Sequence, residues 1–167
     1  SGRRARDAGR EGLTLHVRAL IHAWQGQYAE SLALGTEAAR LGREDRLFVP
    51  LVRGLWNQGI ALHELGEEDR ALAALSDALA LAEKAGDDAQ TPRCRNTVGF
   101  LRIDCGDLDA GIATSEQAYE ETRRSSRAGH GTGAERQAFI RNNQADAFMA
   151  RGDLSSAAQA LDEALNT

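Results

Sequence analysis

Residues Leu55–Ala82, LWNQGIALHELGEEDRALAALSDALALA, predict two helices joined by a tight turn at Gly66. After the turn, alanine or leucine occupies positions 71, 72, 75, 78, 79 and 82, a spacing that makes one apolar stripe on a helix. Gly59 precedes the turn glycine by seven residues, and Ala71 and Ala78 follow it by five and twelve. Small residues there let two backbones approach closely, which is typical of a packed helix pair.

The same spacing recurs three more times along the chain. The turn glycines at 26, 66, 106 and 152 are separated by 40, 40 and 46 residues. A small residue precedes each by seven positions, another follows by five, and an alanine follows by twelve: Ala19, Ser31, Ala38; Gly59, Ala71, Ala78; Gly99, Gly111, Ala118; Ala145, Ala157, Ala164. Four copies at a regular spacing predict an array of helix pairs.

Helix boundaries follow from local signals. Thr91 is predicted to cap a helix whose first residue is Pro92. Asp107 and Asp153, each directly after a turn glycine, are predicted to cap the helices that follow. The first helix of the second pair begins either near Val49 or near Arg46 with a kink at Pro50. A loop is expected at residues 129–133, GHGTG.

These residues resemble the tetratricopeptide repeat (TPR) family. The second repeat carries Trp56-Asn57-x-Gly59, Gly66, Ala71 and Ala78-Leu79, and the fourth carries Asn143, Ala145, Gly152-Asp153, Ala157 and Ala164-Leu165. The first repeat lacks the asparagine, the third has Gly111 in place of alanine, and the closing proline is absent from every copy. The spacing near 40 is similar to the long-period variants found in kinesin light chains and in the sensor arms of bacterial signalling and regulatory proteins.

The resemblance implies an all-α, right-handed superhelix (solenoid) of four helix-turn-helix repeats, at about 5–42, 46–85, 91–127 and 133–165. We expect these repeats to form a single domain over residues 1–167. We also expect the chain to be part of a larger protein. The last pair is predicted to expose an apolar face that a longer protein or a second copy would cover.

Composition and motifs exclude several classes of function. A net charge of −5 argues against a nucleic-acid binder, and the chain has no apolar run long enough to span a membrane. The arginines at 3, 4, 6 and 10 are interpreted as a solvated helix start. Cys94 and Cys105 are too far apart on one helix for a disulfide, which favours a reduced, cytoplasmic setting. The four histidines are not spaced as metal ligands are, and no motif of a catalytic site is present. We therefore predict no metal, no cofactor and no catalysis.

The first helix of each TPR lines a concave groove, and the motif positions place ten candidate side chains there: His16, Arg53, Trp56, Asn57, Arg93, Asn96, Phe100, Asn142, Asn143 and Asp146. Asparagine can hold an extended backbone, arginine can bind a carboxylate, and aromatic rings supply contact area. Trp56 and Phe100 fit packing between helices equally well. The resemblance implies a non-enzymatic module that binds a peptide or a partner domain.

Two alternatives remain open at this point. One is a self-association scaffold, for instance a homodimer through the exposed terminal helices. The other is a small-ligand sensor lined by His16, Trp56 and Arg93. The dicarboxylate clamp of chaperone-binding TPRs is disfavoured, because only Asn57 and Arg93 match its five positions.

Overall fold

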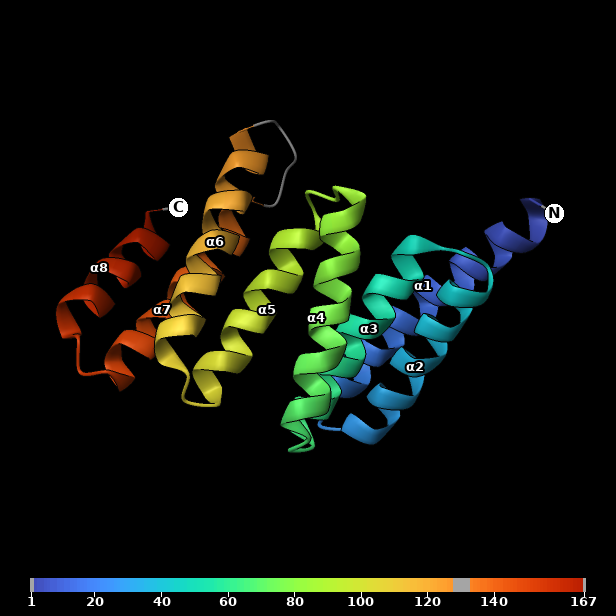
Figure 1. The fold of residues 1–167 in the computed structure, drawn as a ribbon, viewed down its shortest axis with the longest axis horizontal. Helices are drawn as coiled ribbons and strands as arrows, with labels where there is room; N and C mark the ends of the chain where they lie inside the picture. Colours follow the sequence, from blue (N-terminus) through green and yellow to red (C-terminus); the bar gives the residue numbers. More distant parts are fainter. Residues whose placement is uncertain (1, 128–132, 167) are drawn as a thin grey trace. The chain divides into compact units, whose positions relative to one another are not determined.

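The computed structural model describes residues 2–127 and 133–166, and every regular element in these ranges is an α-helix. The helices are α1 (Gly2–Trp24), α2 (Tyr28–Glu44), α3 (Phe48–Glu64), α4 (Glu68–Ala85), α5 (Gln90–Asp104), α6 (Leu108–Arg127), α7 (Gly133–Ala150) and α8 (Leu154–Leu165). They alternate as the first and second helices of four consecutive pairs (Figure 1). The predicted all-α class is confirmed.

Each pair turns at a glycine in the left-handed conformation. Gly26, Gly66, Gly106 and Gly152 have φ of 73, 77, 88 and 79°, which glycine adopts without the cost that a side chain imposes. The residue after each glycine donates its backbone N–H to the carbonyl five residues earlier: Gln27 to His22, Glu67 to Leu62, Asp107 to Arg102 and Asp153 to Phe148. This bond closes the end of the first helix. The four predicted turns are confirmed.

The sequence left two starts open for α3, one near Val49 and one near Arg46 with a kink at Pro50. The structure agrees with the first. The helix begins at Phe48, after Leu47 in an extended conformation. Pro50 is therefore the third helical residue, within the first turn, where a missing N–H costs no helical hydrogen bond.

The prediction that Thr91 caps a helix is wrong. α5 begins at Gln90, so Thr91 is already its second residue. Asp87 is the physical reason, because its Oδ1 accepts the backbone N–H of Ala89 at 2.9 Å and of Gln90 at 2.8 Å. The carboxylate satisfies the first free donors of the helix before the chain reaches Thr91.

Asp153 caps α8 as predicted. Its Oδ1 accepts the backbone N–H of Ser156 at 3.1 Å. Hydrogen bonds from the side chain and the backbone of Ser156 hold the pKa of the Asp153 carboxyl below its ordinary value. The side-chain cap predicted for Asp107 stays a prediction.

The small residues of the repeat lie where helices meet. Every residue seven before or five after a turn glycine is buried: Ala19, Gly59, Gly99, Ala145, Ser31, Ala71, Gly111 and Ala157. Of the alanines twelve after it, Ala38, Ala78 and Ala118 are fully buried and Ala164 is half-buried. Leu72, expected in the buried stripe of α4, is exposed instead, because it lies about 100° around the helix from the buried Ala71.

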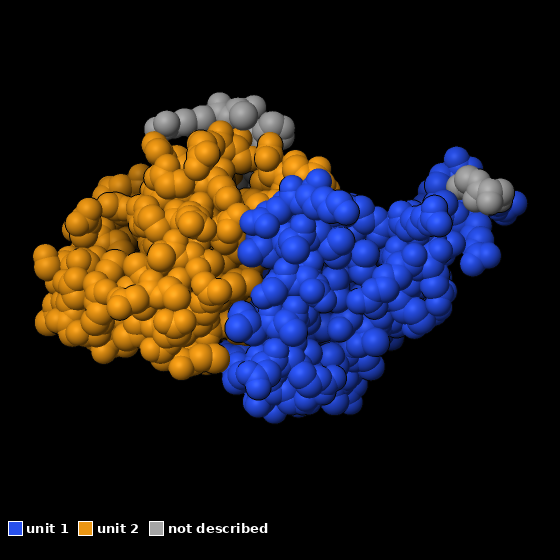
Figure 2. All heavy atoms as spheres, viewed as in Figure 1, with its two compact units in different colours: residues 1–84 blue, residues 85–167 orange. Residues whose placement is uncertain are grey.

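The helices form two compact units, unit 1 of residues 1–84 and unit 2 of residues 85–167 (Figure 2). In unit 1, α2 and α1 both contact α3, so the two pairs meet through three helices. In unit 2, α6 and α5 both contact α7 in the same way. Each unit therefore repeats one contact pattern between consecutive pairs. The single domain over residues 1–167 stays a prediction.

Three further sequence predictions concern the loop at 129–133, the two cysteines and membrane-spanning helices. Residues 129–132 of the expected loop lie outside the described residues, and Gly133 begins α7. Neither Cys94, which is buried, nor Cys105, which is exposed, forms a disulfide bond among the described residues. Within the described part of the chain, none of the helices is both long enough and apolar enough to cross a membrane.

Candidate functional site

The ten predicted groove residues occupy four equivalent positions of the first helices. With repeat offsets of 40, 40 and 46, position 13 corresponds to 53, 93 and 139, and position 16 to 56, 96 and 142. Position 17 corresponds to 57, 97 and 143, and position 20 to 60, 100 and 146. The structure can thus be compared position by position inside each unit.

In unit 1, His16 and Asn57 are buried against each other between α1 and α3. Asn57 is only 2% exposed, and its Nδ2 donates to His16 Nδ1 at 3.0 Å and to the His16 carbonyl at 3.3 Å. Because a carbonyl can only accept, the amide group that faces it is the NH₂, and Nδ1 of His16 must be an acceptor. These two side chains join the helix pairs of unit 1 and do not lie at its surface.

Arg53 and Trp56 are the members of the set that unit 1 leaves partly accessible. They lie one turn apart on α3, so they share a face of the helix. The Trp56 ring meets His16 edge-on, with centroids 6.2 Å apart. Nε of Arg53 is buried and has no hydrogen-bond partner among the described residues. This face therefore combines a cation with an aromatic ring.

In unit 2, the predicted set divides into buried and exposed members. Asn96 on α5 and Asn143 on α7 are buried. Asn96 Oδ1 and Asn143 Nδ2 have no hydrogen-bond partner within the described residues. Phe100 on α5 is 37% exposed, whereas Asn142 and Asp146 are exposed on α7.

Two further residues belong with the accessible members of unit 2. Arg93 is half-buried at the beginning of α5. Phe139, at the position equivalent to Arg93, is exposed on α7, and Asn142 follows it by one turn.

Sequence reasoning missed a charged cluster around Arg141 on α7. Its Nη1 donates to Glu116 Oε2 at 2.6 Å and to Gln144 Oε1 at 2.7 Å. Its Nε lies 2.7 Å from Glu163 Oε2 without hydrogen-bond geometry. The guanidinium also stacks on Tyr119, 3.6 Å from the ring centroid. Burial by itself lowers the pKa of Arg141, but the hydrogen bond and charge of Glu116 outweigh it and raise the pKa.

No sequence signal identifies this cluster, because its members come from three helices. Glu116 lies on α6, Arg141 on α7 and Glu163 on α8. Only the packing of unit 2 brings these carboxylates to one guanidinium. The cluster joins α7 to both of its neighbours, so its role is structural.

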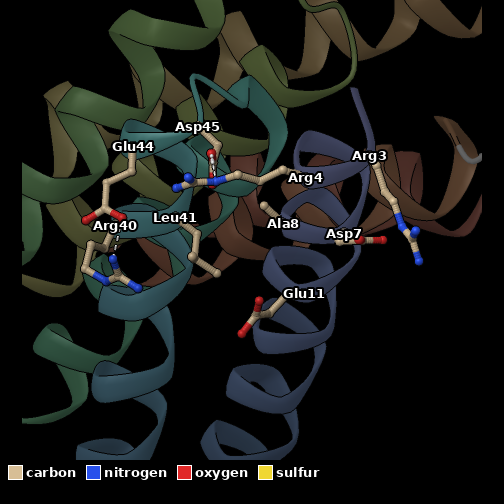
Figure 3. A pocket seen from close by; sticks show the side chains of 9 residues that line it. All are labelled: Arg3, Arg4, Asp7, Ala8, Glu11, Arg40, Leu41, Glu44 and Asp45. Carbon is tan, nitrogen blue, oxygen red and sulfur yellow. Dashed lines mark hydrogen bonds and ion pairs between the residues drawn. The ribbon is translucent and has the colours of Figure 1, made fainter. Parts of the chain in front are cut away.

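A pocket of about 570 Å³ opens between α1 and α2 of unit 1 (Figure 3). Its charged lining consists of three arginines and four carboxylates: Arg3, Arg4, Arg40, Asp7, Glu11, Glu44 and Asp45. Arg4 pairs with Asp45 at 3.2 Å and Arg40 with Glu44 at 2.5 Å. Because cations and anions neutralise one another there, the pocket has no field of one sign for a charged ligand.

The described residues contain no group of three or more His, Cys, Asp or Glu side chains that could hold a metal ion. The candidate residues described above lie on helix faces. They carry aromatic, aliphatic and amide groups with isolated charges.

No family model and no curated protein match the chain. Solved structures do match it. BtubC (BKLC) from P. vanneervenii superposes with a TM-score of 0.76 at 17% identity, over 93% of this chain and 62% of that one. The chain thus spans less than two thirds of BtubC.

Two structures of a protein named as a kinesin light chain of Podosopora anserina, with nearly identical TPR-like repeats, match as well. A point variant gives a TM-score of 0.74 at 16% identity, over 95% of this chain and 74% of that one. A second structure gives 0.60 at 13% identity, over 95% of both chains. At such low identity, these matches establish architecture alone. The protein has a TPR-like helical-repeat fold, built of consecutive helix pairs as in the kinesin light chain structures.

Proposed function

We propose that the protein is a non-enzymatic interaction module that binds a peptide segment, or a segment of a partner domain, on the accessible faces of α3, α5 and α7. TPR-like repeats typically mediate protein–protein interactions, and the resemblance to long-period arrays favours the sensor or scaffold part of a bacterial signalling or regulatory protein. The cytoplasmic setting predicted from the cysteines belongs to this proposal.

The observation that carries the proposal is the location of the exposed aromatic residues. Among the described residues, the large hydrophobic side chains that are exposed include three aromatic ones, Trp24, Phe100 and Phe139. All three lie on first helices of pairs, and Phe100 on α5 and Phe139 on α7 belong to the proposed surface, whereas Trp24 lies on α1 outside it. Exposed rings cost free energy in water and are enriched in binding surfaces.

Polar groups on α3, α5 and α7 suggest the chemistry of the bound segment. Arg53 and Arg93 occupy equivalent positions on α3 and α5, where a guanidinium can bind a carboxylate with two hydrogen bonds. Asn142 can donate to and accept from an extended backbone. A peptide with an acidic residue next to an apolar one fits both units.

Selection from a peptide display library, followed by fluorescence anisotropy with the selected peptides, tests this proposal. We expect Phe100→Ala to weaken binding at least about tenfold, as loss of an aromatic anchor does. Leu72→Ala on α4 is the matched control, because Leu72 is 36% exposed and Phe100 37%. Arg93→Gln should reduce affinity for acidic peptides more than for their amide analogues.

The proposal fails if no peptide is selected. It also fails if the selected peptides lose affinity with Leu72→Ala and keep it with Trp56→Ala, Phe100→Ala and Phe139→Ala.

A further inference from the structure

α1 exposes an apolar stripe along the second half of its length. Leu13, Val17, Ile21 and Trp24 are all exposed, Trp24 to 83%. Their spacing of four, four and three residues places them on one face of the helix. Four neighbouring large apolar side chains on a single face indicate an interaction surface rather than scattered exposure.

The repeat identifies what kind of surface this stripe is. Val17 and Ile21 are equivalent to Asn57 and Ala61 on α3, and those two residues are buried. On α3, the preceding helix pair covers them, since Asn57 bonds to His16 of α1 and packs against Gly35 of α2. The middle of the stripe therefore occupies the position that receives a helix pair inside a unit, whereas the equivalents of its two ends, Arg53 and Glu64, are half-buried and exposed.

The same equivalence holds in unit 2. Val17 and Ile21 correspond to Asn143 and Ala147 on α7, and both of these are buried. The helices α5 and α6, which precede α7, contact it. The residues equivalent to Val17 and Ile21 therefore lie at the contact between helix pairs in both units.

α8 exposes the complementary kind of surface. Leu154, Ala158, Leu161 and Leu165 are exposed at a spacing of four, three and four residues, so they too share one face. α8 is the second helix of its pair, and the second helices α2 and α6 pack on the next first helices, α3 and α7. The exposed face of α8 is thus of the type that packs on a first helix.

The two stripes match in length and in charge. Each covers twelve residues from its first to its last member, an axial rise of about 17 Å. α1 contains five arginines and two carboxylates, whereas α8 contains Asp162, Glu163 and no basic residue. On α1, Arg6 and Arg10 continue the line of the apolar stripe toward the N-terminus.

Antiparallel packing would align these features. α2 and α3, joined by only three residues, pack in this way. Leu165 then meets Leu13, and Leu154 meets Trp24. Arg10 then lies just past the C-terminal end of α8, where the helix dipole is negative, with Asp162 less than two turns away, and Arg6 lies about one turn farther out.

We propose that α8 of one copy of this protein packs on α1 of a second copy, through the stripes Leu154–Ala158–Leu161–Leu165 and Leu13–Val17–Ile21–Trp24. The contact is heterologous, so it leaves one α1 face and one α8 face unused at the ends of a dimer. Association then continues to larger oligomers unless it closes into a ring. This inference does not depend on the proposed peptide binding.

Sedimentation velocity on the whole chain, from about 1 μM to about 1 mM, tests the contact. We expect the average mass to rise with concentration, and to rise less in high salt because exposed charges are screened. Ile21→Glu and Leu161→Glu should each abolish self-association. Leu72→Glu, on the exposed surface of α4, should leave it unchanged, and circular dichroism confirms that each variant is folded.

Mixing the two variants distinguishes this contact from symmetric ones. Ile21→Glu keeps an intact α8 face and Leu161→Glu keeps an intact α1 face, so an equimolar mixture should form a 1:1 complex that grows no further. Symmetric pairing of α1 with α1 would instead let Leu161→Glu dimerise alone. Symmetric pairing of α8 with α8 would let Ile21→Glu do so.

A charge reversal adds an independent readout. Arg10→Glu should weaken self-association at low salt at least about threefold, and the double variant Arg10→Glu with Asp162→Arg should recover it. The proposal is overturned by a monomer at every concentration, by either symmetric outcome, or by a mixture that forms no complex. Co-sedimentation of the whole protein with anionic vesicles, lost in Ile21→Glu while the protein without vesicles stays monomeric, would assign the stripe to a membrane surface instead.

Discussion

Unit 1 and unit 2 are both built of two helix pairs with the same glycine and alanine spacing, yet different chemistry joins the pairs. In unit 1 the contact between α2 and α3 depends on glycine. A methyl group at Gly54 would meet the Ala39 backbone and lie 2.8 Å from the Gly35 carbonyl oxygen. In unit 2 the residue equivalent to Gly54 is Ile140, fully buried. Beside it, Arg141 bonds to Glu116 and stacks on Tyr119, the equivalent of Ala39.

The first helices show the same contrast. In unit 1, Asn57 donates two hydrogen bonds to His16. In unit 2 the equivalent residues are Asn143 and Asn96, and each has a buried amide atom with no partner in the described ranges. Asn57 Oδ1 in unit 1 is likewise buried without a partner there, so the contrast is that hydrogen bonds join the polar pair of unit 1 and none is seen between Asn96 and Asn143.

The comparison teaches that repeat spacing specifies the helix pair but not the contact between pairs. Unit 1 is joined by close backbone approach and should respond most to changes in side-chain volume. Unit 2 is joined by charges around Arg141 and should respond most to changes in charge and salt. The predictions that follow test this difference, from the largest expected effect to the smallest.

Gly54→Ala should destabilise unit 1 by about 3 kcal/mol, because backbone atoms of α2 cannot move aside as a flexible side chain can. Both tryptophans, Trp24 and Trp56, lie in unit 1, so tryptophan fluorescence in urea reports the unfolding of this unit. The midpoint should shift to lower urea concentration.

Gly9→Ala on α1 is the matched control. A methyl group there finds its nearest neighbour, Leu47 Cδ1, at an ordinary 3.9 Å. Because alanine is the better helix former, this change should raise stability by up to about 1 kcal/mol. Equal effects of the two substitutions would contradict the close-approach account of the contact between α2 and α3.

Asn57→Leu should cost about 1–3 kcal/mol, since it removes both hydrogen bonds that Asn57 donates to His16 across the contact between the pairs. Asn143→Leu at the equivalent position breaks no hydrogen bond seen in the structure and should change the stability of unit 2 by less than about 0.5 kcal/mol. Urea unfolding measured by circular dichroism compares the two variants. A larger loss for Asn143→Leu would mean that the amide is satisfied in solution.

The sequence was sufficient for the parts of the fold that depend on local chemistry. Gly66 and the other turn glycines need positive φ, and Asp153 follows one of them as a capping residue, so both could be identified from spacing alone. Thr91 shows the limit of this approach. A second capping residue, Asp87, lies four positions earlier and reaches the first free N–H groups before Thr91 does.

The candidate surface was harder to predict, because exposure depends on which helix covers which face. A family motif assigns Asn57 and Phe100 to the same wall, but α1 covers Asn57 while Phe100 stays exposed. The apolar stripe that includes Ile21 has the same residue types as a buried face, and only the packed structure distinguishes the two. Arg141 gives no sequence signal, since the two carboxylates that it pairs with are more than 20 residues away on other helices.

Arg141→Gln should destabilise unit 2 by about 1–2 kcal/mol, because it removes a partly buried cation from two carboxylates and a ring. Alkylation of the buried Cys94 thiol measures how often unit 2 opens, and the variant should react faster than the wild type. Wild-type reactivity should rise in 1 M salt toward that of the variant. Arg124→Gln, an exposed arginine on α6, is the control and should leave the rate unchanged.

The smallest expected effect is an alkaline loss of stability confined to unit 2. Burial raises the pKa of the Cys94 thiol from 9.0 to about 12, so the folded protein keeps this thiol neutral after the unfolded chain has begun to ionise it. The stabilisation is complete below the unfolded pKa and is lost as pH rises from 9.0 toward 12. Between pH 8 and pH 10, wild-type unit 2 should lose about 1 kcal/mol that Cys94→Ala does not lose. Urea unfolding at the two pH values measures this difference.

Cys105 is the control for this prediction. It is exposed at the end of α5 and should react with iodoacetamide in the folded protein at pH 8 and at pH 10. An equal pH dependence in the wild type and in Cys94→Ala would show that the Cys94 thiol ionises without opening unit 2, which would contradict its burial against the helices of that unit.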